Sequence, residues 1–460
     1  MAKRVPLRHL LFYASPGIPL ALFIPPMPAV LAAFYAQHTA ATTAGIGTAM
    51  LVARIADALT DPPMGYLSDA TKGRWGRRKP WLLAGSLLGM LAMWVFFMPP
   101  AGAGNWYFLL GLLLYYVAMT VMNIPLRAWS SELSDDYSER SRLSLYLTTA
   151  LLVGGLLFFI LPPLLAHESV GLLASAEFNR DTMALFGWIG IALIPLLLGA
   201  ACIGAPVGRS AGQPQTSIIE SFKAVRANGP FWSLMTAESL NYIASGVSYS
   251  VLIIALSNYW GFGDRVSIFL LIVIVVQVAA MPPTGWLALR LGKHRTWGLG
   301  VLGQALVFPL IFVMPPGATP FFVIALFGAA ISIFQAPHMM MPMAMLTDTA
   351  DYDLMKSGKQ RTGNYFALQH LIYKGMNAVG YSLGYFLLAW VGYDPAIPEN
   401  TASANLGLQV IVGVVAPVFL LACGVVLFRY PLTAERHAVI RRFIRRRETR
   451  LSATTRQVPG

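Results

Sequence analysis

Charged residues are scarce in this sequence. Aspartate, glutamate, lysine and arginine make up 12% of its 460 residues, whereas soluble domains carry about 25%. Hydrophobic residues make up 56% of the chain. They gather in stretches of about 20 residues or more, long enough to cross a bilayer as helices. The shortage of charge excludes a string of ordinary soluble domains and predicts an all-α membrane protein.

Cysteine is also nearly absent. The two cysteines, Cys202 and Cys423, each lie in an apolar stretch, which argues against a disulfide framework and a zinc site. No nucleophile–base pair and no cluster of metal ligands stands out, so the sequence predicts neither an enzyme nor a bound cofactor. The basic start is followed by further apolar stretches and no cleavage site, so we expect no cleaved signal peptide.

The apolar stretches predict twelve membrane spans, and an even number places both termini on one side. The predicted spans are 9–36, 43–69, 80–99, 106–133, 143–166, 184–206, 229–258, 266–290, 295–315, 320–347, 363–393 and 405–429.

The basic residues indicate which side that is. They fall in alternate loops and at both ends of the chain, with Arg180 and Arg265 as exceptions. This is the positive-inside pattern, which predicts cytoplasmic termini and a multi-pass protein of a bacterial inner membrane. Charge spread over many loops argues against nucleic-acid binding. The Arg-rich segment 433–450 is typical of a helix lying on anionic lipid, although a regulatory partner is an alternative.

A repeated fragment marks two halves. Residues 62–67 (PPMGYL) match residues 282–287 (PPTGWL), and each fragment closes the second span of its half. Internal duplication is common in transporters. The sequence therefore predicts a six-helix half at 1–206, a cytoplasmic connector at 207–228, a second six-helix half at 229–430 and a basic cytoplasmic tail at 431–460.

The halves differ in their second spans. Asp57 and Asp61 are four residues apart and share a helix face, whereas the repeat places Gln277 and Met281 at the matching positions. Two carboxylates inside a membrane need a neutralising partner. We interpret the pair as a cation site for Na⁺, a metal-ion site in that case, or for a proton. The alternative is a structural ion pair between Asp57 and Arg54.

A few other polar side chains accompany the pair. Oxygen ligands suit hard cations, and Thr60 and Thr120 could add hydroxyls to the site. Lys374 in the eleventh span needs an acidic partner or a solute. Asn123 and Trp129 in the fourth span are candidate solute contacts, although an asparagine also joins helices. Less specific candidates are Glu238, for which an interfacial or capping role is equally open, and His338.

Two cytoplasmic loops carry mixed charge. Asp69 precedes the basic run that contains Arg77 and Arg78, and a second loop carries acidic residues followed by Arg140 and Arg142. Ion pairs at helix ends are typical of gates that change partners between conformations. We therefore expect gating ion pairs among Arg54, Asp69, Arg77, Arg78, Glu132, Arg140 and Arg142. The alternative is charge that only fixes topology.

These motifs resemble the glycoside–pentoside–hexuronide:cation symporter family of the major facilitator superfamily. The resemblance spans nearly the whole chain and rests on the following segments: 53–62 (ARIADALTDP), 74–80 (RWGRRKP), 123–125 (NIP), 132–140 (ELSDDYSER), 348–352 (DTADY) and 374–375 (KG).

The resemblance implies roles for individual residues. Asp57 and Asp61 match the family's cation-site aspartates, Thr120 matches a ligand threonine, and Thr60 replaces a ligand asparagine. Lys374 matches a lysine near the cation and sugar sites. The family's galactoside-binding groups do not carry over, because the first span has no acid, the fourth has Asn123 and the fifth has Leu147. We expect poor transport of melibiose-type galactosides.

The expected function is cation-coupled symport of a small organic solute, a sugar, glycoside or uronide, by alternating access. Asn123, Trp129 and Lys374 are the expected solute contacts, and a monomer is expected. The alternatives are transport of an amphiphilic, lysolipid-like solute on the same fold, and a non-transporting membrane sensor.

Overall fold

The computed structural model describes residues 4–24, 27–134, 136–208, 222, 225–358 and 361–456. Every regular element in these ranges is helical, so the prediction of an all-α protein is confirmed. The predicted connector lies mostly outside the described residues, and the division of the chain into domains stays a prediction.

The first half begins with an interrupted helix. The predicted span 9–36 falls within one membrane-spanning stretch, Leu7–His38. Its helix is interrupted near Pro16 and Pro19, because proline lacks the backbone N–H that a helix interior requires. The helices of this half are α1 (Leu7–Ala14), α2 (Gly17–Leu20), the 3₁₀ turn η1 (Ala21–Phe23), α3 (Met27–His38), α4 (Thr43–Ala70), α5 (Lys79–Phe97), α6 (Asn105–Leu133), α7 (Tyr137–Leu165) and α8 (Arg180–Gly204).

The second half repeats the long helices with more irregular ends. It contains α10 (Gly229–Ile254), the π turn η2 (Ala255–Tyr259), η3 (Gly263–Arg265), α11 (Val266–Leu291), α12 (Lys293–Val307), η4 (Phe308–Val313), α13 (Phe321–Ser357), α14 (Thr362–Trp390), α15 (Ala402–Val410), the π turn η5 (Ile411–Val415) and α16 (Ala416–Phe428). The basic tail forms α17 (Ala434–Arg456).

Ten helical stretches among the described residues are long and apolar enough to cross a membrane. The two predicted spans missing from this set are α4 and α14, which have 28 and 29 residues and are long enough to cross. Helix α4 contains Arg54, Asp57, Asp61 and Asp69, and α14 contains Lys374. The count of twelve therefore stays a prediction.

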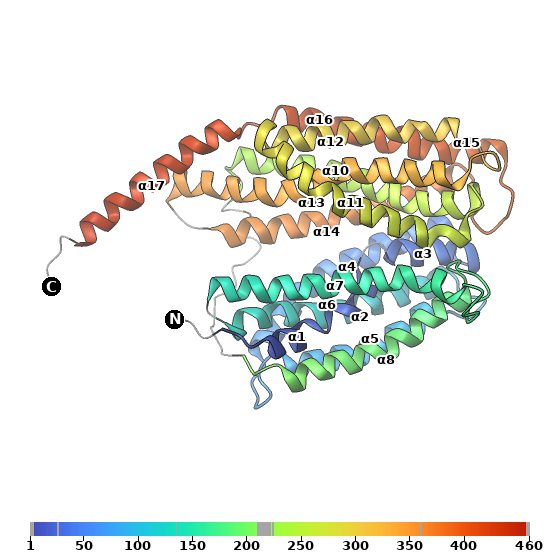
Figure 1. Ribbon diagram of the computed structural model, residues 1–460, viewed down its shortest axis with the longest axis horizontal. Coiled ribbons are helices and arrows are strands. Elements are labelled where there is room, and N and C mark those ends of the chain that lie inside the picture. The colour runs from blue at the N-terminus through green and yellow to red at the C-terminus, as the bar shows by residue number, and fades with distance from the viewer. Residues whose placement is uncertain are drawn as a thin grey trace.

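The halves lie side by side as two layers, with α1 to α8 in one and α10 to α16 in the other (Figure 1). Both termini lie at the same end of the bundle (Figure 1). Three helix pairs of opposite halves pack together: α4 against α14, α7 against α11 and α3 against α10.

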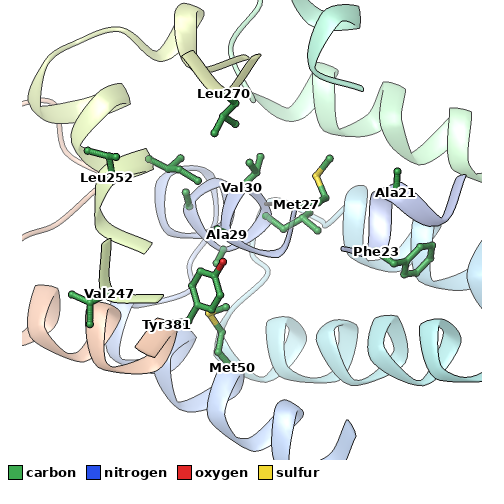
Figure 2. Packing of buried hydrophobic residues seen from close by; sticks show 14 of the residues in the cluster. Ala21, Phe23, Met27, Ala29, Val30, Met50, Val247, Leu252, Leu270 and Tyr381 are labelled. Atoms are coloured by element: carbon green, nitrogen blue, oxygen red, sulfur yellow. The ribbon is translucent and has the colours of Figure 1, made fainter. Parts of the chain in front are cut away.

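The end opposite the termini is sealed by apolar packing. Figure 2 shows Val30 of α3 near Leu270 of α11, and Met50 of α4 near Tyr381 of α14. Helix α3 also packs against α10. A hydrogen bond of 2.7 Å from Gln37 to Ser257 also joins the halves there. This end is therefore closed between the halves.

Candidate functional site

The two aspartates lie in the middle of α4. The helix begins after Thr42, whose side chain accepts a hydrogen bond from the backbone N–H of Gly45, so its first turn is capped. Asp57 is 3% exposed, whereas the Asp61 side chain is 24% exposed. One carboxylate is thus enclosed by protein, and its neighbour one turn away remains accessible.

Thr120 of α6 links the two carboxylates. Its hydroxyl oxygen lies 3.0 Å from Asp57 Oδ1 and 3.0 Å from Asp61 Oδ1. A hydroxyl has one hydrogen to donate, so it bonds one carboxylate at a time, and its lone pairs face the same space. The structure therefore brings together three of the four predicted cation-site residues.

The fourth residue uses its hydroxyl elsewhere. Thr60 donates to the backbone carbonyl of Asp57, at 3.0 Å within its own helix. The role of Thr60 as a cation ligand stays a prediction.

Two cations balance the aspartates. Lys374 Nζ of α14 lies 2.5 Å from Asp61 Oδ2 and 3.0 Å from Asp57 Oδ2. Arg54 Nη1 lies 3.2 Å from Asp57 Oδ2, and its guanidinium stacks 4.5 Å from the centre of the Tyr116 ring. The predicted Arg54–Asp57 pair is therefore present alongside the Lys374 bridge. Two acids and two bases form a neutral cluster, and Lys374 spans the two halves.

Asn123 is hydrogen-bonded to a residue that the sequence analysis missed. Arg127 Nε donates to Asn123 Oδ1 at 2.9 Å. Thr120, Asn123 and Arg127 are spaced by three and four residues and therefore share one face of α6. That spacing was available in the sequence and could have identified Arg127.

Trp129 lies inside the first half. Its side chain is 1% exposed, with Tyr13 packed edge-on at 6.0 Å and Lys79 Nζ 5.6 Å from its ring. In this conformation its ring is covered by protein, and its role as a solute contact stays a prediction.

Four of the predicted gate residues form a cluster at the C-terminal ends of α4 and α6. Arg78 contacts Asp69 Oδ1 at 2.5 Å and Glu132 Oε1 at 2.7 Å. Its Nη1 also donates to the Ser68 hydroxyl at 2.6 Å, and Arg77 lies 3.9 Å from Glu132. These contacts join the ends of α4 and α6 to the start of α5, so they hold three helices of one half together.

The next two arginines, Arg140 and Arg142, contact residues close to them in the sequence. Arg140 Nε donates to the carbonyl of Ser134, and Arg142 contacts Glu139 at 2.8 Å. Asp136 caps α7, and the hydrogen bond from the Ser138 hydroxyl holds the pKa of Asp136 below its ordinary value. Asp135 lies outside the described residues.

The second half holds its own polar groups. Glu238 of α10 is fully buried inside the protein. Its Oε1 accepts a hydrogen bond of 2.8 Å from Gln369 of α14, and its Oε2 has no partner within the described ranges. His338 packs 4.8 Å from the Tyr242 ring, and its Nδ1 has no partner there either.

The geometry can now be compared with known proteins. The profile of the MFS/sugar transport protein family matches residues 12–434. The chain belongs to this family. The resemblance to glycoside–pentoside–hexuronide:cation symporters is thereby confirmed, and the chain is a multi-pass membrane transporter, not an enzyme.

Named relatives of the transporter are symporters and carriers. It is 25% identical to the Escherichia coli glucuronide carrier protein homolog over 415 residues, which cover 88% of each chain. It is 24% identical to the sodium-dependent lysophosphatidylcholine symporter 1-A of Danio rerio, over 84% of this chain and 78% of that protein.

Solved structures share the fold at lower identity. The nucleoside transporter NupG superposes with a TM-score of 0.65 at 12% identity, covering 92% of this chain and 100% of that chain. A bacterial homologue of the lysosomal transporter Spinster, in an inward-facing and unoccupied conformation, gives 0.64 at 15% identity, covering 95% of this chain and 97% of that chain. These similarities establish the major facilitator fold.

Proposed function

We propose that this transporter couples the entry of Na⁺ or H⁺ to the uptake of a small organic solute by alternating access. One observation carries the proposal: Asp57 and Asp61 of the first half share Lys374 of the second half. Lys374 belongs to one half and the acids belong to the other. A cation or proton that binds the acids therefore changes the strength of a contact between the halves.

The coupling follows from charge balance. The cluster is neutral with Lys374 in place, so an arriving cation competes with the ammonium for the same carboxylate oxygens. A bound cation weakens the Lys374 bridge and frees α14 to move relative to α4. Solute that binds the cation-loaded state better then raises cation affinity by the same factor, since coupling free energy is reciprocal.

The orientation follows from the same proposal. The predicted positive-inside pattern puts the termini in the cytoplasm, and both termini lie at one end (Figure 1). The apolar seal around Val30 and Leu270 then faces outward (Figure 2). We propose that the structure represents a conformation closed to the outside, with twelve spans in two six-helix halves that act as a monomer.

The proposed solute is a glycoside or uronide. The glucuronide carrier homolog among the relatives supports this class. Galactosides of the melibiose type are poor candidates, because Leu147 is buried and apolar at the position where such family members have an arginine. Losing one partner of a buried charged hydrogen bond costs about 2 to 5 kcal/mol of binding free energy.

An amphiphilic solute is the second candidate. A cleft of about 540 Å³ lies between α1, α2 and α7, and most of its lining side chains are apolar, among them Leu11, Ile18 and Val153. Such a cleft suits an acyl chain, and the lysophosphatidylcholine symporters among the relatives favour the same class.

The test is transport by the purified protein in proteoliposomes. Labelled glucuronides, glucosides and lysophosphatidylcholine are offered under an inward Na⁺ gradient, an inward proton gradient or neither. We expect one gradient to drive accumulation of at least one solute above equilibrium. Equilibration without accumulation under both gradients would reject the symport mechanism.

A further inference from the structure

One face of α6 carries polar side chains along two turns. Thr120 touches both aspartates, Asn123 lies three residues further on, and Arg127 four residues beyond that. At 1.5 Å per residue, Arg127 lies about 10 Å along the helix from the cation cluster. The face therefore leads from the aspartate pair toward the end of the bundle that holds the termini.

Arg127 differs from the other cations of this region in its partners. Arg54 and Lys374 are both paired with the aspartates. The Arg127 guanidinium is exposed, and among the described residues its one hydrogen-bond partner is the neutral amide of Asn123. An arginine has five N–H donors, so four of them remain free for a ligand. Because the aspartate cluster is already neutral, the positive charge of Arg127 is not balanced.

Simple anchoring at the membrane surface does not explain Arg127. A snorkelling arginine extends away from the membrane centre to reach water. Here Arg127 bonds the residue four positions earlier, so its guanidinium is held toward the middle of the helix. The bond to Asn123 also fixes the plane of the guanidinium, which favours two-point recognition of an oxyanion.

We propose that Arg127 binds an oxyanion of the transported solute, a carboxylate or a phosphate, with Asn123 orienting its guanidinium. This inference rests on the proposed symport function and narrows its substrate to anionic or zwitterionic solutes. In this conformation the aspartates occupy Lys374, whereas the Arg127 guanidinium is exposed.

The experiment compares solutes that differ only in the anionic group. Binding to purified protein in nanodiscs is measured for p-nitrophenyl glucuronide against p-nitrophenyl glucoside, and for lysophosphatidic acid against a monoacylglycerol of the same chain. The variants are Arg127→Gln, Arg127→Lys and, as a control, Arg295→Gln on the exposed surface of α12. The first pair tests a carboxylate and the second a phosphate.

We expect one charged solute to bind at least tenfold tighter than its uncharged partner. Arg127→Gln should weaken binding of the charged solute about 10- to 100-fold, which is the effect of losing one charged hydrogen bond. Arg127→Lys should keep part of this affinity, and Arg295→Gln should keep all of it. The affinity for the uncharged partner should not change in any variant.

Two results would overturn the inference. One is equal binding of the charged and uncharged members of both pairs. The other is unchanged affinity for the charged solute in Arg127→Gln. Both results are compatible with gradient-driven uptake of a neutral solute, so they reject the anion site without rejecting symport. Failure of both gradients to drive uptake would instead reject the proposed function.

Discussion

Two of the contacts between the halves are related by the repeat but differ in charge. In one, α4 of the first half packs against α14 of the second; in the other, α11 of the second half packs against α7 of the first. The first contact holds Asp57, Asp61 and Lys374. The facing segments of the second, 143–165 and 266–289, contain no charged residue.

This difference separates a contact that only packs the two halves together from a contact that can also bind a cation. Both contacts can serve as surfaces on which the halves rock, because both pack helices of opposite halves. Only the charged one can respond to a cation. If the acids of α4 were needed only for packing, the repeat-related helix α11 would carry acids too. It does not, so we infer that the acids of α4 serve a task specific to the first half.

A second comparison concerns an ion pair that is present at the same place in both halves. The start of α5 is tied to the end of α6 by Arg78 and Glu132, and the start of α12 is tied to the end of α13 by Lys293 and Asp348, at 2.6 Å. These ties occupy the same place in each half. We interpret them as part of the frame that both halves need, which moves with its half when the halves rock.

The largest expected effect comes from breaking the charged contact. Lys374→Ala leaves the buried Asp57 and the accessible Asp61 with Arg54 alone, and breaking a buried ion pair costs about 3 to 5 kcal/mol. We expect a lower melting temperature in cation-free buffer and a larger recovery on adding the coupling cation than the wild type shows, because the cation replaces the lost charge. Equal cation effects in the two proteins would disprove the competition between Lys374 and the cation.

A smaller effect should follow from removing the frame ties. Arg78→Ala loses several charged hydrogen bonds at a side chain 7% exposed, and we expect a loss of about 2 to 3 kcal/mol in the free energy of unfolding. Lys293→Ala, at a side chain 38% exposed, should lose about 1 kcal/mol. Both variants should lower the maximal uptake rate more than they raise KM. A large rise in KM at an unchanged maximal rate would instead place these residues in the solute site.

The smallest effect is expected at Glu238. Its carboxylate is fully buried and has a neutral amide as its hydrogen-bond partner, so a neutral isostere removes the cost of burying charge. Glu238→Gln should leave the thermal midpoint unchanged or slightly higher and preserve cation-driven uptake. Loss of uptake in a stably folded Glu238→Gln protein would show that the second half also carries a coupling acid.

The sequence was sufficient to predict the features with strong local signals. Apolar length predicted the helices, and the four-residue spacing of Asp57 and Asp61 predicted their shared face. Partners distant in sequence were harder to predict. The bridge from Lys374 to both aspartates depends on how α14 meets α4, and the neighbours of Trp129 depend on how α1 and α5 pack. The spacing of Arg127 from Thr120 predicts their shared face of α6, whereas the position of that face beside the aspartates depends on how α6 packs against α4.

The central claim is that the asymmetric acids of α4 are the coupling site. Its direct test is uptake into proteoliposomes by Asp57→Asn and Asp61→Asn under imposed Na⁺ or proton gradients, with Gln277→Asn at the repeat-related position of α11 as the matched control. We predict that the wild type and the control accumulate solute under one of the gradients, and that neither aspartate variant does so while remaining folded and inserted. Uphill accumulation by both aspartate variants would contradict the account.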